Sequence, residues 1–102
     1  MFSTNQFYKE AKNQFSFLTK EQNFKLVTSK NENMFVYLEY EKEQTRVKIN
    51  YDRRDNYLSI SAINLRIPEE EFVHRFKNVE HFPKEIELSA KKVRSMCLHF
   101  LN

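Results

Sequence analysis

The chain has 102 residues and contains no glycine. Phosphate-binding loops of the Walker and Rossmann types need glycine, because backbone N–H groups must approach the anion closely. Both loop types are therefore excluded. Turns must use other residues wherever the backbone requires a positive φ, and asparagine is the best substitute.

Cysteine and long apolar runs are also scarce. Cys97 is the single cysteine, which excludes an internal disulfide and a cysteine-based metal framework. Residues 1–15 are polar and lack the apolar core of a signal peptide. No stretch approaches the ~20 apolar residues of a membrane span. These features predict a cytoplasmic protein that does not associate with membranes.

Basic residues only slightly outnumber acidic residues. Seventeen basic and 14 acidic residues give a net charge of +3, and residues 1–30 carry this excess. A dedicated nucleic-acid binder gathers Lys and Arg into a stripe or patch. The charge therefore gives little support to a nucleic-acid partner.

Aromatic residues are abundant, with ten Phe and five Tyr among 40% hydrophobic residues. This composition is typical of a globular chain, and the length predicts a single α+β domain over residues 1–102. With no glycine and few alanines, we expect a core built largely from bulky rings.

Hydrophobic periodicity predicts one helix and then four strands. Apolar residues near the N-terminus recur at steps of three and four: Phe7, Ala11, Phe15 and Leu18. This spacing predicts a helix over residues 4–20. Apolar and polar residues then alternate in three segments, which predicts strands over 23–30, 45–51 and 57–63. Residues 34–40 are apolar on both faces and are predicted to form a fourth strand between the first two.

The apolar faces suggest how these strands pair, because a one-residue slip would turn an apolar set toward water. Tyr40 opposite Thr45 would leave residues 41–44 as a loop. Asp52 opposite Tyr57 would place the second loop between those two residues. Both pairings predict an antiparallel meander.

The first hairpin is predicted to close through residues 31–33, with Val36 opposite Thr28. Asparagine tolerates the left-handed backbone conformation better than most residues. Asn33 and Asn56 are therefore the predicted positive-φ positions.

The C-terminal third is predicted to contain two helices. Pro68 and the three following glutamates are typical of a helix start, so a short helix is expected over 68–79, ending before Pro83. Apolar spacing predicts a last helix, with an apolar side formed by Ile86, Ala90, Val93, Cys97 and Phe100. The predicted fold is α+β: a four-stranded antiparallel meander with an N-terminal helix and two C-terminal helices on one face.

No arrangement of residues indicates catalysis. Glu71 and His74 have the i, i+3 spacing of half a di-iron site, but such a site needs a second Glu-x-x-His motif and two further glutamates on long helices. Cys97 lies on a predicted apolar stripe, and His99 would point to another helix face. We therefore predict a non-enzyme with no metal, no cofactor and no catalytic residues.

The second sheet face mixes aromatic, charged and small polar residues. In the predicted register Glu39 lies opposite Arg46 and Tyr37 lies opposite Lys48. A solvated face stabilised by such cross-strand pairs is one interpretation. The other is a recognition surface, because exposed aromatics beside cations are typical of binding sites.

Arg53 and Arg54 stand where the last predicted hairpin turns, between Asp52 and Asp55. They could be solvated residues of a turn that Asp and Asn stabilise locally. Alternatively, arginines at a protruding tip can bind a carboxylate of a partner.

The segment "FKLVTSKNENMFVYLEYEKEQTRVKINYDRRDNYLSISA" resembles a pattern of small bacterial immunity proteins, which protect cells from polymorphic or contact-dependent toxins. The resemblance covers about residues 24–63, under half of the chain. The residues that carry it are Val36, Tyr37, Tyr51, Asp52, Arg53 and Arg54. A glycine common before the first strand is absent, and Asn23 stands near its place.

The resemblance implies a non-catalytic cytoplasmic protein that binds and neutralises the C-terminal domain of a cognate toxin. Many immunity proteins against nucleases are acidic, whereas this chain is slightly basic, which fits exosite inhibition or another kind of toxin better. The expected toxin contacts are Tyr37, Arg46, Lys48, Arg53, Arg54 and Tyr57.

Other functional classes remain open at this point. A small RNA- or DNA-binding module would use the aromatic and basic sheet face. A secretion chaperone or a phage-encoded inhibitor would have similar size and composition. The chain is expected to be a monomer or a weak homodimer, and the edge strand at 24–30 is a possible contact.

Overall fold

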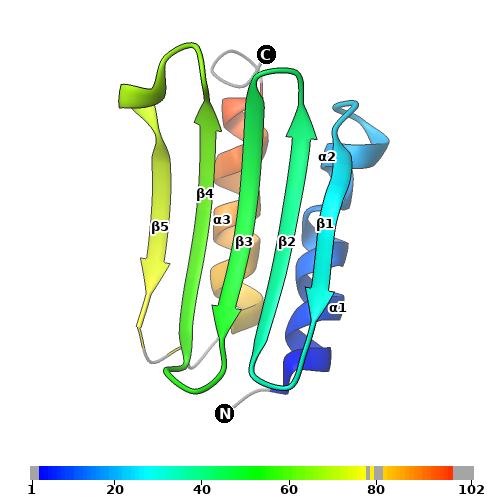
Figure 1. The fold of residues 1–102 in the computed structure, drawn as a ribbon, viewed down its shortest axis with the longest axis vertical. Helices are drawn as coiled ribbons and strands as arrows, with labels where there is room; N and C mark the ends of the chain where they lie inside the picture. Colours follow the sequence, from blue (N-terminus) through cyan, green and yellow to red (C-terminus); the bar gives the residue numbers. More distant parts are fainter. Residues whose placement is uncertain (1–2, 78, 80–81, 98–102) are drawn as a thin grey trace.

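Five antiparallel strands form one sheet, and helices from both ends of the chain pack on one of its faces (Figure 1). The computed structural model describes residues 3–77, 79 and 82–97. The elements are α1 (Thr4–Gln14), α2 (Ser16–Lys20), β1 (Lys25–Asn31), β2 (Phe35–Lys42), β3 (Thr45–Asp52), β4 (Tyr57–Asn64), a 3-10 turn (Pro68–Glu70), β5 (Phe72–Phe76) and α3 (Phe82–Met96). The strands lie side by side in sequence order. The predicted α+β class is confirmed.

The N-terminal helix begins with a reciprocal cap. The Ser3 hydroxyl accepts a hydrogen bond from the Gln6 N–H at 3.1 Å, and the Gln6 side chain accepts one from the Ser3 N–H at 3.0 Å. The predicted helix over 4–20 is divided at Phe15, where φ is −98° and ψ is 9°. The predicted apolar stripe is fully buried: Phe7, Ala11, Phe15 and Leu18.

The pairing of β3 with β4 has the predicted register. Asp52 lies opposite Tyr57, and Ile49 lies opposite Ile60. Both isoleucines are fully buried beneath the helices. Burial of alternate residues excludes a one-residue slip, and the turn between Asp52 and Tyr57 was placed correctly, so the predicted pairing holds.

The pairing of β2 with β3 differs from the prediction by two residues. Tyr40 lies opposite Val47 rather than Thr45, so the turn contains only residues 43–44. Glu43 has φ 52°, and neither glycine nor asparagine marks this tight turn in the sequence. A shift of two residues leaves each side chain on its predicted face.

The pairing of β1 with β2 also differs from the prediction. The register shifts between Leu26 and Thr28, which places an extra residue in β1 and changes the alternation beyond it. Thr28 therefore lies opposite Glu39, not Val36, and does not share the inner face with Leu26. Val36 pairs instead with Asn31.

Positive φ angles occur at three described residues: Asn23, Glu43 and Asn56. The prediction for Asn56 is confirmed. The prediction for Asn33 is wrong, because the loop between β1 and β2, at residues 32–34, turns without a positive φ at Asn33.

The predicted helix over 68–79 is wrong. Pro68–Glu70 forms only a 3-10 turn, and Phe72–Phe76 forms β5. This strand extends the predicted four-stranded meander by a fifth antiparallel strand, with His74 opposite Ile60. The sequence "FVHRF" alternates with the period of a strand and contains aromatic and β-branched residues, which suit a sheet edge.

The last helix starts earlier than expected. Pro83 lies in the first turn of α3 rather than before the helix, where its missing N–H costs no hydrogen bond. Four of the predicted apolar residues are buried: Ile86, Ala90, Val93 and Cys97. Phe100 lies outside the described residues. Because residues 68–76 form a 3-10 turn and β5, the described residues contain one C-terminal helix instead of the two predicted.

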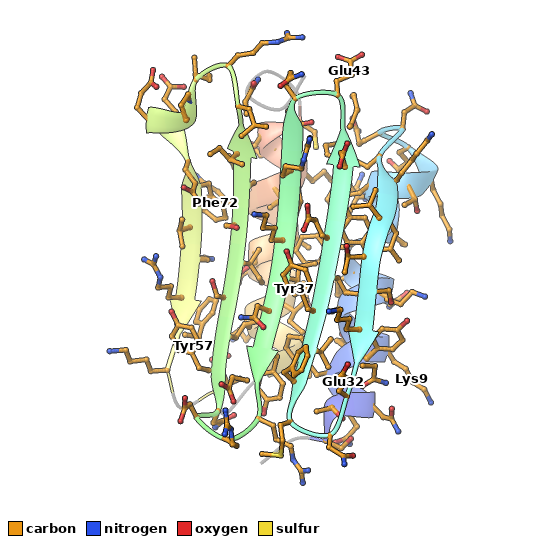
Figure 2. All side chains as sticks on the ribbon, viewed as in Figure 1. Lys9, Glu32, Tyr37, Glu43, Tyr57 and Phe72 are labelled. Atoms are coloured by element: carbon orange, nitrogen blue, oxygen red, sulfur yellow. The ribbon has the colours of Figure 1, made fainter. Side chains whose placement is uncertain are left out.

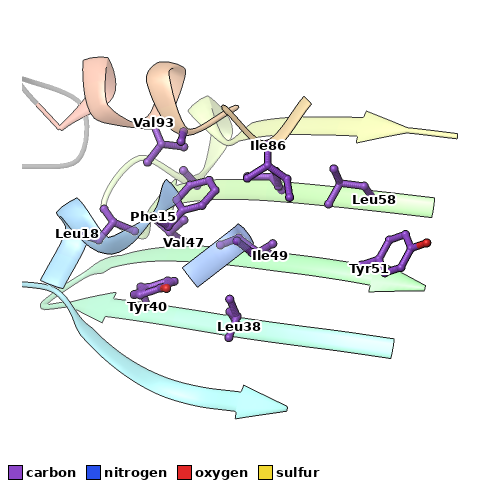
Figure 3. Packing of buried hydrophobic residues seen from close by; sticks show 14 of the residues in the cluster. Phe15, Leu18, Leu38, Tyr40, Val47, Ile49, Tyr51, Leu58, Ile86 and Val93 are labelled. Atoms are coloured by element: carbon purple, nitrogen blue, oxygen red, sulfur yellow. The ribbon is translucent and has the colours of Figure 1, made fainter. Parts of the chain in front are cut away.

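The core lies between the sheet and the helices α1 and α3 (Figure 3). Phe7 of α1 stacks on Tyr51 of β3, with ring centroids 4.5 Å apart and an interplanar angle of 16°. Both side chains are fully buried. Stacked aromatic pairs of this kind stabilise a fold by ~1 kcal/mol beyond their burial.

Asn56 connects this core to the segment before the C-terminal helix. Its side-chain oxygen accepts a hydrogen bond from the Tyr51 hydroxyl at 3.0 Å, and its Nδ2 donates to the Val79 carbonyl at 2.8 Å. The Val79 N–H also donates to the Asn56 carbonyl at 3.1 Å. The turn after β3 is thus joined to the segment that leads into α3.

We predict that Asn56→Ala lowers the free energy of unfolding by about 3 kcal/mol, because it removes two side-chain hydrogen bonds and places alanine at positive φ. Asn56→Gly should cost less, about 1–2 kcal/mol, since glycine tolerates the backbone conformation. Urea unfolding measures both values. Asn33→Ala is the matched control and should change stability by less than about 0.5 kcal/mol. Equal costs at the two asparagines would contradict this prediction.

Candidate functional site

No described element covers the sheet face opposite the helices (Figure 1, Figure 2). Along β2, β3 and β4 every second residue is buried, and most of the alternating residues are half-buried or exposed. We call the surface formed by these alternating residues the open face. Its members on β2, β3 and β4 are Phe35, Tyr37, Glu39, Glu41, Arg46, Lys48, Asn50, Asp52, Tyr57, Ser59, Ser61 and Ile63, and Val73 and Arg75 of β5 continue it.

Two predicted pairs on the open face are wrong because of the two-residue register shift. Glu39 lies opposite Lys48 rather than Arg46, and Tyr37 lies opposite Asn50. The Tyr37 hydroxyl donates a hydrogen bond to the Glu39 carboxylate on the same strand, at 2.6 Å. Burial and, to a smaller extent, this carboxylate raise the pKa of Tyr37 to about 12.

Arg46 is held by its own hairpin. Its Nε lies 3.4 Å from the Glu41 carboxylate, and its Nη1 donates to the carbonyls of Glu43 and Thr45 at 2.7 and 2.9 Å. The guanidinium therefore stabilises the turn between β2 and β3. Among the six predicted contact residues, Arg46 has the clearest structural role.

Arg53 and Arg54 lie in a turn with a fixed backbone. Asp52 Oδ1 accepts hydrogen bonds from the N–H groups of Arg54 and Asp55, at 3.0 and 3.5 Å. The Arg53 N–H donates to the Met34 carbonyl in the neighbouring loop at 2.8 Å. Both arginine side chains are exposed, and within the described ranges neither forms an ion pair.

The six predicted residues do not form one cluster. Tyr57 lies near the end of the sheet that carries Arg53 and Arg54, while Tyr37 lies nearer its middle (Figure 2). Lys48 is exposed on the middle of β3. Arg46 lies toward the opposite end, beside the turn at residues 43–44. The structure thus brings the turn arginines and Tyr57 together and separates Arg46 from them.

Arg75 is a basic residue that the sequence reasoning missed. It lies on the open face opposite Ser59 of β4 and is exposed, and Lys77 follows directly after β5. The sequence predicts a helix for Arg75 and Lys77, because Pro68 and the glutamates after it are typical of a helix start. The strand period of "FVHRF" could have placed Arg75 on this face. These two cations add positive charge to the part of the open face that continues to Arg53 and Arg54.

His74 lies on the inner side of the sheet. Its Nδ1 is 3.0 Å from the hydroxyl of Ser89, which is fully buried on α3. The rings of Phe72 and Phe76 flank the imidazole, with centroids 5.2 and 4.9 Å away. The imidazole therefore satisfies a buried hydroxyl at the junction of β5 and α3.

The predicted pairing of Glu71 and His74 on one helix face is wrong, because His74 lies on a strand. In the described part of the chain, no three His, Cys, Asp or Glu side chains gather where they could hold a metal ion. Cys97 is buried, and desolvation raises the pKa of its thiol. His99 lies outside the described residues. None of the helices within the described ranges has the length and apolar character needed to cross a membrane.

Three comparisons with known proteins give no match for this chain: a scan against protein-family models, a search of curated proteins and a search of solved structures. The resemblance to small immunity proteins therefore depends on the motif residues of β2, of the end of β3 and of the turn after it.

We predict that Glu39→Gln lowers the pKa of Tyr37 part of the way from about 12 toward 10, because it removes the carboxylate charge and leaves the burial unchanged. NMR titration of the tyrosine rings measures this change. Tyr40 faces the core, and burial also raises its pKa to about 12, so it is the internal control. An equal fall at both tyrosines would contradict the assignment.

The raised pKa of Tyr37 also makes the stability of the fold depend on pH. The pKa of Tyr37 is higher in the folded state than the usual 10.0, so folding favours the neutral phenol. This contribution is present below about pH 10 and is lost as the pH rises toward 12. Tyr37→Phe should therefore show a smaller loss of stability across this interval in urea unfolding.

Proposed function

We propose that this protein is a non-catalytic cytoplasmic immunity protein that binds and neutralises the C-terminal domain of a cognate bacterial toxin. The observation that carries the proposal is the exposed pair Arg53 and Arg54, held in a fixed turn at the end of an uncovered sheet face. These two arginines also belong to the segment that resembles small immunity proteins.

The turn suits a protein partner because its backbone is already ordered before binding. Asp52, Asn56 and Met34 each hold it through hydrogen bonds, so binding would order little more than the two side chains. An ordered loop loses less entropy on association. Arginine presents several N–H donors in a plane and binds carboxylates through two parallel hydrogen bonds.

The charges near the turn favour an acidic surface on the toxin. The exposed cations in this region are Lys48, Arg53, Arg54, Arg75 and Lys77. Three carboxylates oppose them: Asp52 and Asp55 in the turn, and Glu39 opposite Lys48. The remaining positive charge would increase the association rate with an acidic partner and disfavour basic ones.

The size of the open face also bears on the interface. Five strands about 4.8 Å apart and about eight residues long span a projected area of roughly 450 Å². A stable interface buries about 800 Å² on each partner. An interface of that size would occupy the whole open face, and the turn with Arg53 and Arg54 is the part that we expect it to include.

An RNA- or DNA-binding module is the alternative that one observation favours, because Tyr37 and Tyr57 share the open face with cations. Base stacking would require free aromatic faces, whereas Tyr37 is half-buried and bonded to Glu39. The two functions differ in their salt dependence. Binding to nucleic acid should fall steeply as salt rises, because phosphate contacts release counterions.

The proposal predicts that affinity purification from the native host recovers a toxin through its C-terminal domain. With that domain in hand, Arg53→Ala/Arg54→Ala should raise the dissociation constant by about 30-fold or more, the range expected when interface hot spots are removed. The thermal unfolding midpoint should change little, since both side chains are exposed. Calorimetry measures the affinity, and a toxin challenge measures protection.

Lys91→Ala/Lys92→Ala is the matched control, because it removes the same charge from exposed residues of α3 on the helical side. It should leave affinity and protection unchanged. Equal effects of the two double variants would remove the arginine turn from the site. Recovery of RNA alone, with binding that falls steeply with salt, would overturn the immunity function.

A further inference from the structure

The two edges of the sheet differ in how well they are protected from strand addition. A bulge interrupts β1 between Leu26 and Thr28, and the strand carries the exposed lysines Lys25 and Lys30. Bulges and edge lysines are the usual means by which proteins prevent edge-to-edge pairing. The β1 edge is therefore protected.

The β5 edge lacks a bulge, a proline and a lysine. Its ladder with β4 is continuous from Ala62 opposite Phe72 to Leu58 opposite Phe76. Because strand backbone groups point alternately to either side, about half of those in β5 face away from β4. No described element lies beyond this edge (Figure 1), and in the described ranges residues 72–76 form no other backbone hydrogen bond.

The sequence around β5 is complementary to itself in the antiparallel direction. If two copies pair with His74 opposite His74, then Phe72 lies opposite Phe76 of the second copy. Glu71 then lies opposite Lys77 of the second copy at both ends of the ladder. Aromatic pairs and pairs of opposite charge both stabilise antiparallel strands. Glu71 and Lys77 are exposed in the single chain, so both can form this contact.

Neighbouring registers are less favourable. Centring the pair on Arg75 would place two arginines directly opposite each other, which is repulsive. Centring it on Val73 would require Glu70, part of the 3-10 turn, to lie opposite Phe76. The register centred on His74 is the one that pairs β5 over its whole length and balances the charges at both ends.

We propose that two copies of this chain associate through β5, antiparallel and two-fold symmetric about His74, to form a continuous ten-stranded sheet. Residues directly opposite each other share a sheet face, so both open faces lie on the same side of the dimer. The two arginine turns lie at opposite ends, because the paired strands run in opposite directions. The contact is small, so the dimer is weak. Lys77 takes part in this contact and also belongs to the cations proposed to attract the toxin, but self-association is measured without the toxin, so the two proposals can fail separately.

A charge exchange tests this register. Sedimentation velocity of the full chain over a concentration series should show a reversible monomer–dimer equilibrium. Glu71→Lys and Lys77→Glu should each raise the dissociation constant roughly tenfold, because each places like charges together at both ends of the symmetric ladder. The double variant Glu71→Lys/Lys77→Glu restores both pairs and should return the constant to within about threefold of the original.

Lys30→Glu in β1 is the matched control, since it makes the same charge change on the other edge strand. It should leave the equilibrium unchanged. A chain that stays monomeric at the highest concentration would overturn the proposal. So would single variants that dimerise normally, a double variant that fails to recover, or a dimer that is lost only with Lys30→Glu.

Discussion

The Tyr51 side chain connects the four parts of the molecule on which the proposed site depends. Its ring stacks on Phe7 of α1, and its hydroxyl donates to Asn56 in the turn after β3. Asn56 then bonds to Val79 before α3. One buried side chain thus couples the N-terminal helix, the sheet and the arginine turn to the segment that precedes the C-terminal helix. The burial of Tyr51 raises the pKa of its phenol, which keeps the hydroxyl proton available for this bond.

One face of the sheet can remain uncovered because the other face supplies the burial that stabilises it. The helices from both ends of the chain bury the same face, and that burial holds the sheet together. The open face is then free of the packing constraint and carries charges and small polar residues. Its basic end lies beside the turn fixed by Asn56. The part of the surface proposed for binding is therefore also the part connected most directly to the core.

The sequence was a good guide to which face of each strand in β2, β3 and β4 is buried. Ile49 and Ile60 also pair as predicted, because a one-residue slip would expose the apolar set and the turn after β3 was placed correctly. Asn56 was identified because a chain without glycine must use asparagine where φ is positive. Glu43 could not be identified in this way, because glutamate does not mark turns, and the β2–β3 pairing was consequently misplaced by two residues.

The C-terminal third was harder to predict because two local signals conflicted. Pro68 and the glutamates after it are typical of a helix start, but they form only a single 3-10 turn. The strand period of "FVHRF" is the weaker of the two signals, and the pairing of β5 with β4 decides the structure. Arg75 was missed for the same reason, while Arg53 and Arg54 were located correctly because their turn follows from the neighbouring strands.

Amide hydrogen exchange of the Val79 N–H in a Tyr51→Phe variant tests this coupling most directly. This substitution removes only the hydroxyl and keeps the ring that stacks on Phe7. The account predicts that exchange at Val79 and in the turn at residues 53–56 becomes faster, while exchange in β1 and β2 is unchanged. Unchanged exchange at Val79 would show that the core does not hold the arginine turn, and would contradict the account.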